Sequence, residues 1–235
     1  MNIENKILSY EVRKRYKKWD LYRKTNKIWN IHKFNSREKI GIVNQLVKSY
    51  YKELNDKNDF DEGGFLKYYT EHAKTLSDLY DISLDFNKIL KTTYDINVSE
   101  TITFNFVIMR VIDESVNGLK REILILNYLK GIYNNKYNVR LSDYYTDINY
   151  RIDIEVFDDR SNIKEAYQVK PISYIYSIKY KNSVNHDICM KDHNYNVKKQ
   201  EQYKDKHNCD IYYITANEDI SDIKIYDCNL NIIKR

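Results

Sequence analysis

Residues 150–171 constrain the fold of this chain more than any other stretch, because they predict a β-hairpin. We expect a first strand over about 150–157 and a second strand over about 165–170. Residues 158–162 join them, and the Asp, Ser and Asn of this segment are frequent turn formers. Pro171 ends the second strand, since proline has no backbone N–H to donate to a ladder.

Alternation along these strands predicts one apolar and one polar face, because successive side chains point to opposite sides. The apolar positions are Ile152, Ile154, Val156, Tyr167 and Val169, and Arg151 and Glu155 join the polar face. On that face we expect Asp153, Gln168 and Lys170 to lie side by side. A carboxylate, an amide oxygen and a lysine together can hold a divalent cation and a phosphate. The simpler interpretation is a half-buried hairpin with a polar outer face, and the neighbouring elements must decide between the two.

Composition limits the class of protein without defining a function. A chain of 235 residues can bury a full core in one or two domains. Its net charge of +5 is compatible with a nucleic-acid partner. The 24 tyrosines, with one proline and five glycines, indicate an AT-rich genome rather than a chemical requirement.

Cysteine usage and the lack of apolar spans predict a cytoplasmic protein. The cysteines are Cys189, Cys209 and Cys228. An odd, sparse set argues against a disulfide framework, and His186, Cys189 and His193 lack the matching second pair of a zinc site. Residues 1–6 are followed by a charged segment, not by the apolar core of a signal peptide. The most apolar stretch, 102–112, is too short to span a membrane.

The N-terminal arm, residues 1–30, is charged and predicted to be helical. Its basic run with interleaved aromatic residues is typical of an arm that binds a nucleic-acid backbone, and Arg13 and Arg15 are the candidate phosphate contacts. The alternative is a solvated helix face with Trp19 and Tyr22 buried.

The rest of the N-terminal half, up to residue 112, is predicted to be mostly helical. Ser36 can cap a helix over about 37–54, and a second helix covers about 64–80. Residues 81–112 are ambiguous, because their apolar residues alternate as in a strand but also suit a buried helix. We expect this region, 1–112, to serve in DNA binding or dimerisation.

Residues 115–135 give the clearest helix, and Glu122 lies on or beside its apolar stripe. A glutamate in that position must reach solvent or meet a partner. A metal or Lys170 on the following sheet would be such a partner. The alternative is a surface pair with Arg121 or Lys120.

The remaining elements are a strand near 138–146, a polar loop over 172–191, a helix over 192–207 and a strand at 210–215. A long loop beside a reaction centre can read a substrate. The residues that we expect to contact DNA from this part of the chain are Lys179, Lys181, Asn182, Asn185, Lys198 and Lys199.

The element order α-β-β-β-α-β, with the motif Asp153-x14-Gln168-x-Lys170, resembles the PD-(D/E)XK nuclease superfamily, to which many type II restriction endonucleases belong. The Gln-x-Lys variant resembles the Mrr-like branch. The matching runs, which look like MjaI-type restriction enzymes, are Leu119-Lys120-Arg121-Glu122-Ile123, Arg140-Leu141, Ile152-Asp153 and Gln168-Val169-Lys170-Pro171-Ile172-Ser173-Tyr174. The resemblance covers about residues 115–215 and includes no part of the N-terminal half.

Two positions depart from the family pattern. Tyr150-Arg151-Ile152 lacks the usual small Gly or Pro before Asp153, which weakens the alignment of that aspartate. Gln168 replaces the commoner Glu or Asp, which leaves one fewer negative charge at a metal. Glu155 or Glu122 could supply that charge.

The resemblance implies an α/β (α+β) fold with a restriction-endonuclease-like αβββαβ core over 113–235. It implies a Mg²⁺-dependent enzyme that cuts double-stranded DNA at a specific short sequence and leaves 5′-phosphate ends. The expected metal ligands are Asp153, Gln168, the Val169 carbonyl and Glu122, and Lys170 would position the attacking water. A palindromic site would require a homodimer. The alternatives are another PD-(D/E)XK nuclease, for repair, junctions or modified DNA, and a non-catalytic nucleic-acid-binding protein.

Overall fold

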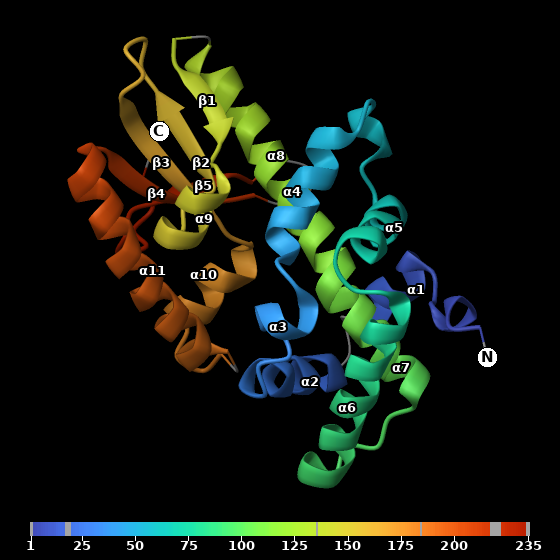
Figure 1. The fold of residues 1–235 in the computed structure, drawn as a ribbon. Coiled ribbons are helices and arrows are strands. Elements are labelled where there is room, and N and C mark those ends of the chain that lie inside the picture. Colours follow the sequence, from blue (N-terminus) through green and yellow to red (C-terminus); the bar gives the residue numbers. More distant parts are fainter. Residues whose placement is uncertain (1, 17–19, 135, 184, 217–221, 234–235) are drawn as a thin grey trace. The chain divides into compact units, whose positions relative to one another are not determined.

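The computed structural model describes residues 2–16, 20–134, 136–183, 185–216 and 222–233 (Figure 1). The chain forms two compact units, Met1–Leu119 and Lys120–Arg235. The units meet within helix α8 (Glu114–Tyr133), whereas the sequence suggested a division between residues 112 and 113. Within the described ranges, every helix is too short or too polar to cross a membrane.

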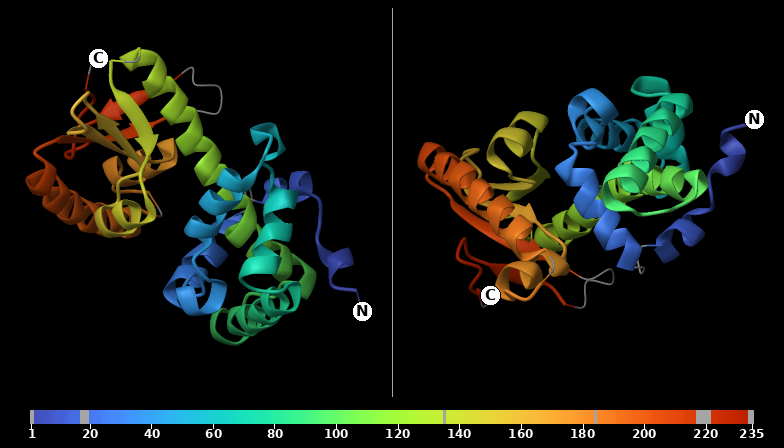
Figure 2. Two further views of the ribbon diagram at one scale, coloured as in Figure 1. Left: turned by 45° about the horizontal axis from the view of Figure 1, so that its top comes forward. Right: turned by 90° about the horizontal axis from the view of Figure 1, so that it is seen from below.

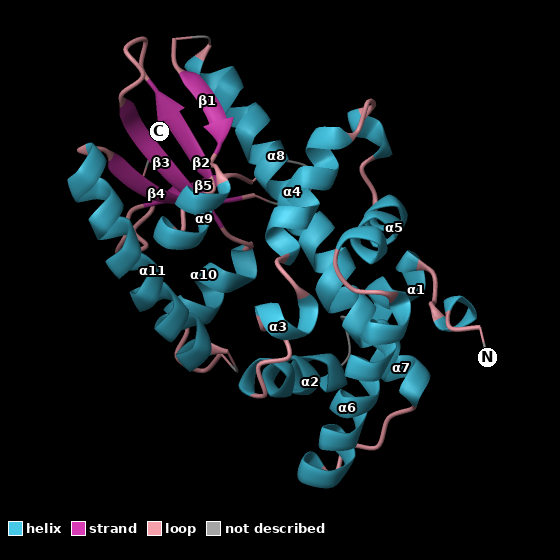
Figure 3. Cartoon of the chain, viewed as in Figure 1, coloured by secondary structure: helices cyan, strands magenta, loops and turns pink. Residues whose placement is uncertain are grey.

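The regular elements among the described residues of the first unit are helices, joined by loops (Figure 3). Its elements are η1 (Glu4–Lys6), α1 (Tyr10–Tyr16), α2 (Asp20–Ile31), α3 (Arg37–Ile40), α4 (Val43–Glu53), η2 (Lys57–Asp59), α5 (Glu62–His72), α6 (Leu76–Tyr94), α7 (Glu100–Ile108) and the π-helix η3 (Met109–Asp113), which leads into α8. The ambiguous segment is therefore helical. In α7, residues 103–108 are all buried, so apolar residues occupy every side of the helix and obscure its period.

Two predicted helices are each divided in two. The helix expected over 37–54 breaks at Gly41, whose φ of 74° is accessible to glycine but strained for most residues. Ser36 precedes α3 but makes no side-chain capping bond. The helix expected over 64–80 ends at His72, because Thr75 and Asp78 form a capping box that starts α6.

Aromatic side chains form the centre of the first unit. The ring of Trp29 lies 5.1 Å from that of Phe34 and 5.2 Å from that of Phe86, and the rings of Phe86 and Phe106 are 5.4 Å apart. All four side chains are buried. Rings at these separations contribute packing beyond their buried area, so this cluster holds α2, α6 and α7 together.

The second unit contains a five-stranded mixed sheet. Its strands are β1 (Asn138–Leu141), β2 (Ile154–Phe157), β3 (Ile163–Val169), β4 (Asp210–Thr215) and β5 (Lys224–Tyr226), in the spatial order β1-β2-β3-β4-β5. Strands β3 and β4 pair in parallel, and the other three pairs are antiparallel. The connection between β3 and β4 contains α10 (Ile172–Lys179) and α11 (His186–His207). The expected mixed α/β architecture is confirmed.

Helices cover both faces of the sheet (Figure 2). Ile125 and Leu129 of α8 pack with Ile154 and Tyr167 on one face. On the other face, Tyr203 of α11 packs with Ala166 and Ile152. Because helices pack on both faces of β2 and β3, these two strands form the centre of this unit.

Several predicted boundaries near this sheet are wrong. The strand expected near 138–146 ends at Leu141, because Asp143 caps a helix, α9 (Tyr144–Tyr150), by accepting from the backbone N–H of Thr146. The strand expected over 150–157 consequently begins only at Ile154. The loop expected over 172–191 is largely helical, since α10 follows Pro171 directly and α11 begins at His186. Apolar residues at 172, 175 and 178 carry the helical spacing that identifies α10.

Candidate active site

Asp153 lies directly before β2 and links it to the end of β3. Its backbone N–H donates to the Tyr167 carbonyl over 2.9 Å. Its carboxylate oxygen Oδ2 accepts from the backbone N–H of Val169 over 2.7 Å. The side chain thus takes a position in the ladder that a backbone carbonyl would otherwise fill, and this places the carboxylate beside the segment that leads into Lys170.

The backbone before Asp153 alters the predicted assignment of faces. Arg151 ends α9 in the left-handed conformation with φ of 60°, and regular pairing starts only at Ile154. As a result Ile152 packs on the α11 side with Ala166, not on the α8 side with Ile154. The expectation that Ile152 and Ile154 share one face is therefore wrong. The expected shared face of Tyr167 and Val169 is confirmed, because both pack toward α8.

Gln168 is buried on the face that α11 covers. Its side-chain oxygen accepts from the amide nitrogen of Gln200 over 3.0 Å. The same nitrogen donates to the Arg151 carbonyl at 3.2 Å. The other end of that amide, Gln200 Oε1, is buried and has no hydrogen-bond partner among the described residues. Gln200 therefore connects the end of α9 to Gln168 on β3.

Lys170 follows β3 and points toward α11. Its ammonium nitrogen lies 3.4 Å from Oδ2 of Asp192 and 4.6 Å from the ring centroid of Tyr174. The same carboxylate oxygen accepts from the side-chain amide of Asn196 over 3.1 Å. Asp192 thus holds both a cation and an amide on one side of α11. The sequence prediction missed this carboxylate, although the four-residue spacing of Asp192, Asn196 and Gln200 could have identified it.

Tyr213 of β4 lies among the same groups and pairs in register with Gln168. Burial raises the pKa of its hydroxyl, and the carboxylates of Asp192 and Asp153 raise that pKa further. The phenol therefore stays protonated at neutral pH. We call the residues assembled here the Asp153 cluster; its members are Asp153, Gln168, Lys170, Asp192, Gln200 and Tyr213.

The two candidate substitute ligands lie in different surroundings. Glu155 is buried and accepts a hydrogen bond from the hydroxyl of Tyr203, and its other oxygen is 3.9 Å from Nε of Arg140. Its carboxylate is thus already held by a phenol and a guanidinium group. Glu122 is half-buried on α8, the helix whose Ile125 packs on the opposite sheet face. The role of Glu122 as a ligand stays a prediction.

The oxygen donors of the Asp153 cluster fit the magnesium ion that the family resemblance implies. No group of three or more His, Cys, Asp or Glu suited to a metal occurs within the ranges that the structure describes. Magnesium is commonly held by one or two carboxylates, together with waters and substrate phosphates. The carboxylate of Asp153 and the amide oxygen of Gln168 match this chemistry. The partnerless Gln200 Oε1 is the kind of buried atom that a bound cation or water satisfies.

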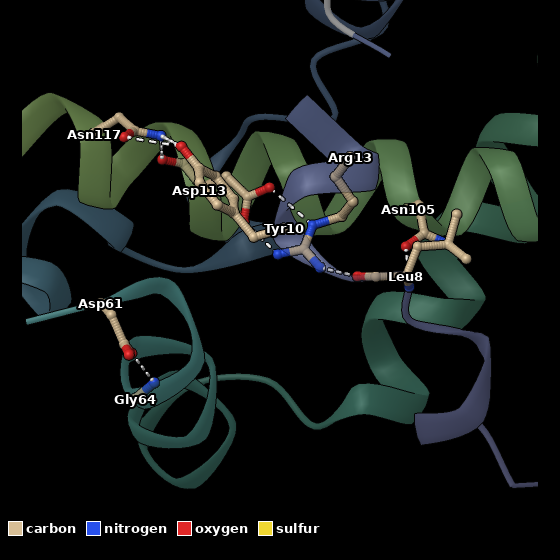
Figure 4. A network of polar contacts seen from close by, with 8 residues as sticks. All are labelled: Leu8, Tyr10, Arg13, Asp61, Gly64, Asn105, Asp113 and Asn117. Atoms are coloured by element: carbon tan, nitrogen blue, oxygen red, sulfur yellow. Dashed lines mark hydrogen bonds and ion pairs between the residues drawn. The ribbon is translucent and has the colours of Figure 1, made fainter. Parts of the chain in front are cut away.

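The predicted role of Arg13 as a DNA contact is wrong, because its side chain is only 6% exposed. Figure 4 shows its guanidinium group against both carboxylate oxygens of Asp113, at 2.7 and 2.8 Å, and against the Leu8 carbonyl. Arg15 is exposed. Trp19, the aromatic residue of the same basic run, lies outside the described residues. Tyr22 is half-buried and donates to Glu114.

The other predicted DNA contacts lie on helices and on a short turn, not on a long loop. Lys179 ends α10, and Lys181 and Asn182 follow it in the turn; all three side chains are exposed. Asn185 is half-buried at the start of α11. The same helix carries Lys198, which is exposed, and Lys199, which is half-buried. A DNA contact by these residues stays a prediction.

The described geometry brings together two carboxylates, two amides, an ammonium group and a phenol beside the start of β2 and the end of β3. Comparisons of this chain with family models, curated proteins and solved structures found no match.

Proposed function

We propose that this protein is a Mg²⁺-dependent endodeoxyribonuclease of the PD-(D/E)XK type, and that it acts as a type II restriction endonuclease on a specific short sequence in double-stranded DNA. The observation that carries the proposal is the position of Lys170. It follows β3 directly after Gln168 and Val169, and the N–H of Val169 is bonded to the carboxylate of Asp153. The three motif residues thus belong to one end of one strand pair.

The topology supports the same proposal. With α9 and α10 set aside as additions, the order is α8, β1, β2, β3, α11 and β4. This is the αβββαβ order of the superfamily. The connection that contains α11 leads from β3 to β4, and these two strands pair in parallel. The helix α11 in that crossover carries Asp192 and Gln200 to the Asp153 cluster.

The residues of this chain would divide the chemistry as follows. Asp153, with the Gln168 side chain and the Val169 carbonyl, would hold the metal, and Glu122 is the further ligand that the resemblance suggests. A magnesium ion held by these residues would polarise the phosphate and lower the pKa of a coordinated water. Hydrolysis would form a new P–O bond from water and break the bond to the 3′ oxygen, which would take up a proton, so that the products are a 5′-phosphate and a 3′-hydroxyl.

Lys170 would supply positive charge where the transition state gains negative charge. A preorganised cation at such a position is worth more than one in bulk water, because it does not have to reorient during the reaction. Asp192 at 3.4 Å and the Tyr174 ring at 4.6 Å restrict the ammonium group. We assign Asp192 as a positioning residue for Lys170. Recognition of a palindromic sequence would require two copies related by a two-fold axis.

Cleavage of unmethylated plasmid and phage DNA tests this function. The purified protein is incubated with Mg²⁺ or with EDTA, beside the variants Asp153→Asn and Lys170→Ala. Matched controls are Asp159→Asn in the exposed turn and Lys164→Ala, an exposed lysine of β3. We expect discrete fragments with the wild type and both controls. We expect a loss of about a hundredfold or more with either site variant, and no cleavage in EDTA.

Other outcomes would redirect the proposal. Cutting that survives both site substitutions would place the active site elsewhere. Cutting only of branched or methylated DNA would favour a repair, junction or modified-DNA nuclease. Salt-sensitive binding without cleavage, unaffected by EDTA, would favour a non-catalytic nucleic-acid-binding protein.

A further inference from the structure

Helices α9 and α11 present exposed tyrosine rings among cationic side chains. Tyr145 is 61% exposed and Tyr195 is 48% exposed. The two helices are in contact with each other. We call this region the α9–α11 surface, and its residues are Tyr144, Tyr145, Tyr150, Arg151, Lys191, Tyr195, Lys198, Lys199 and Lys206.

Cations lie close to the rings of this surface. The guanidinium carbon of Arg151 is 5.6 Å from the ring centroid of Tyr195, and the ammonium nitrogen of Lys199 is 6.0 Å from the same centroid. Lys206 approaches the Tyr150 ring at 5.7 Å. These distances are within the range of cation–π attraction. The cations therefore restrict the rings of Tyr195 and Tyr150, while about half of Tyr195 remains open to solvent.

One row along α11 is made of lysines and a tyrosine, and the exposed carboxylates of Asp187, Asp192 and Asp205 lie beside that row. Lys191, Tyr195, Lys199 and Lys206 recur at spacings of four and seven residues, so they share one face of the helix. Lys198 and Gln202 lie beside that row. The opposite side of α11, with His193, Asn196 and Gln200, is buried. A row of lysines around an aromatic ring fits a polyanion that also has flat apolar groups.

The α9–α11 surface adjoins the Asp153 cluster through two residues. Arg151 is two positions before Asp153 in the sequence, and its carbonyl accepts from Gln200. Asp192, which pairs with Lys170, lies one helical turn before Tyr195 and Asn196 on α11. A strand bound along α11 would therefore lie next to the site of the proposed cleavage.

We infer that the α9–α11 surface binds a short unpaired segment of DNA next to the Asp153 cluster. Bases in a duplex stack on each other and offer no open face to a protein ring, whereas unpaired bases stack on exposed aromatic side chains. The lysines would bind the phosphates of the same segment. This inference rests on the proposed function for its choice of DNA, and it adds that unpaired nucleotides beside the cleavage site favour binding and cleavage of the duplex.

Fluorescence anisotropy in EDTA tests the inference without requiring cleavage. The probes are a labelled oligothymidylate of about 12 nucleotides and a blunt duplex of the same length. We expect the wild type to bind the single strand more tightly than the duplex. Tyr195→Ala and Tyr145→Ala should each weaken single-strand binding by about tenfold, the effect expected from one lost base stack. The matched control is Tyr176→Ala, because Tyr176 is 53% exposed but belongs to α10.

The variant Tyr195→Phe separates stacking from hydrogen bonding. A phenylalanine keeps the ring and removes the hydroxyl, so single-strand affinity should stay within about twofold of wild type. A loss as large as that of Tyr195→Ala would mean that the hydroxyl binds a phosphate, and the inference would be overturned. Equal affinity for duplex and single strand, or no effect of the two alanine variants, would also overturn it.

Cleavage measured on the same proteins distinguishes failure of this inference from failure of the proposed function. Tyrosine-dependent binding of the single strand without any cleavage would sustain the inference and reject the nuclease. Cleavage of a plain duplex, with unchanged binding in the tyrosine variants, would sustain the nuclease and reject the inference. With both correct, a duplex carrying an unpaired flank should be cut faster than the blunt duplex, and Tyr195→Ala should remove that preference.

Discussion

The ammonium group of Lys170 lies 3.4 Å from the carboxylate of Asp192, and this pair joins the end of β3 to α11. The two residues are separated by 22 positions in the sequence. The Lys170 side chain is 19% exposed and that of Asp192 is 48% exposed, so the pair is open to solvent on one side. An ion pair of this exposure adds little to stability. The pair instead restricts the direction in which the Lys170 ammonium group points.

Under the proposed function, Asp192→Asn should reduce the cleavage rate by about tenfold to a hundredfold, because Lys170 would be less well positioned. The free energy of unfolding should change by less than about 1 kcal/mol. Rates measured under single-turnover conditions, together with urea denaturation, check both parts. Asp187→Asn is the matched control, since Asp187 is an exposed carboxylate on the same helix. Full activity of Asp192→Asn would show that Lys170 does not need this partner.

Gln200→Leu should destabilise the second unit by about 1–3 kcal/mol, because it leaves buried acceptors without a donor. The acceptors are the Gln168 side-chain oxygen, at 3.0 Å, and the Arg151 carbonyl, at 3.2 Å. Urea denaturation followed by circular dichroism measures the loss. Gln202→Leu is the control on an exposed position of the same helix. If the two variants have the same free energy of unfolding, the Gln168–Gln200 hydrogen bond makes no net contribution to stability.

The sequence predicted the hairpin and its central motif because period-two alternation and turn residues are local signals. It placed Tyr167 and Val169 on one face correctly, since β3 pairs without interruption with β4 from Glu165 to Val169. The predicted face of Ile152 was wrong, because the left-handed backbone conformation of Arg151 delays the start of β2. No local sequence pattern predicts that conformation for an arginine. The alternation rule holds only where the backbone is paired as a regular strand.

The contribution of α11 to the Asp153 cluster was only partly predictable. The segment 172–191 is rich in lysine and asparagine, so its polar composition indicated a loop and concealed the early start of α11 at His186. Asp192 was therefore the first residue of the expected helix, and a residue at a helix boundary cannot be assigned to one face of that helix. Which tertiary partners a polar helix residue meets depends on the packing of that helix on the sheet, and hydrophobic period alone does not determine it.

Arg13→Ala should destabilise the protein by about 3–5 kcal/mol, because it removes the guanidinium group that faces the buried carboxylate of Asp113. The guanidinium group donates two hydrogen bonds to that carboxylate, at 2.7 and 2.8 Å, and Lys in its place could not reproduce both. Thermal or urea denaturation of Arg13→Ala and Arg13→Lys measures the effect. The control Arg15→Ala alters an exposed neighbour and should cost less than about 0.5 kcal/mol. An Arg13→Ala variant that is fully stable but binds DNA weakly would restore the discarded role as a DNA contact.

The three cysteines should differ in their reactivity in the order of their exposure. Cys228 is exposed, Cys189 is half-buried and Cys209 is buried. Burial raises the pKa of the Cys209 thiol to about 11, and Asp210 adds to the rise; burial also raises the pKa of Cys189. At pH 8 only roughly one Cys209 thiol in a thousand would be ionised, and the thiolate is the reactive form. Iodoacetamide should therefore modify Cys228 first and Cys209 last.

Mass spectrometry of peptides from a labelling time course measures this order. In guanidinium chloride all three cysteines should react at similar rates, because the burial that separates them is lost. Raising the pH from 7 to 9 should raise the thiolate fraction of Cys209 about a hundredfold, because its pKa of about 11 lies above this window, but the buried thiol should still react more slowly than Cys228. Labelling of Cys209 as fast as Cys228 in the native protein would mean that the packing of Cys209 against Tyr203 and Ala166 is wrong. That result would also question the placement of α11 on the sheet, and with it the Asp153 cluster.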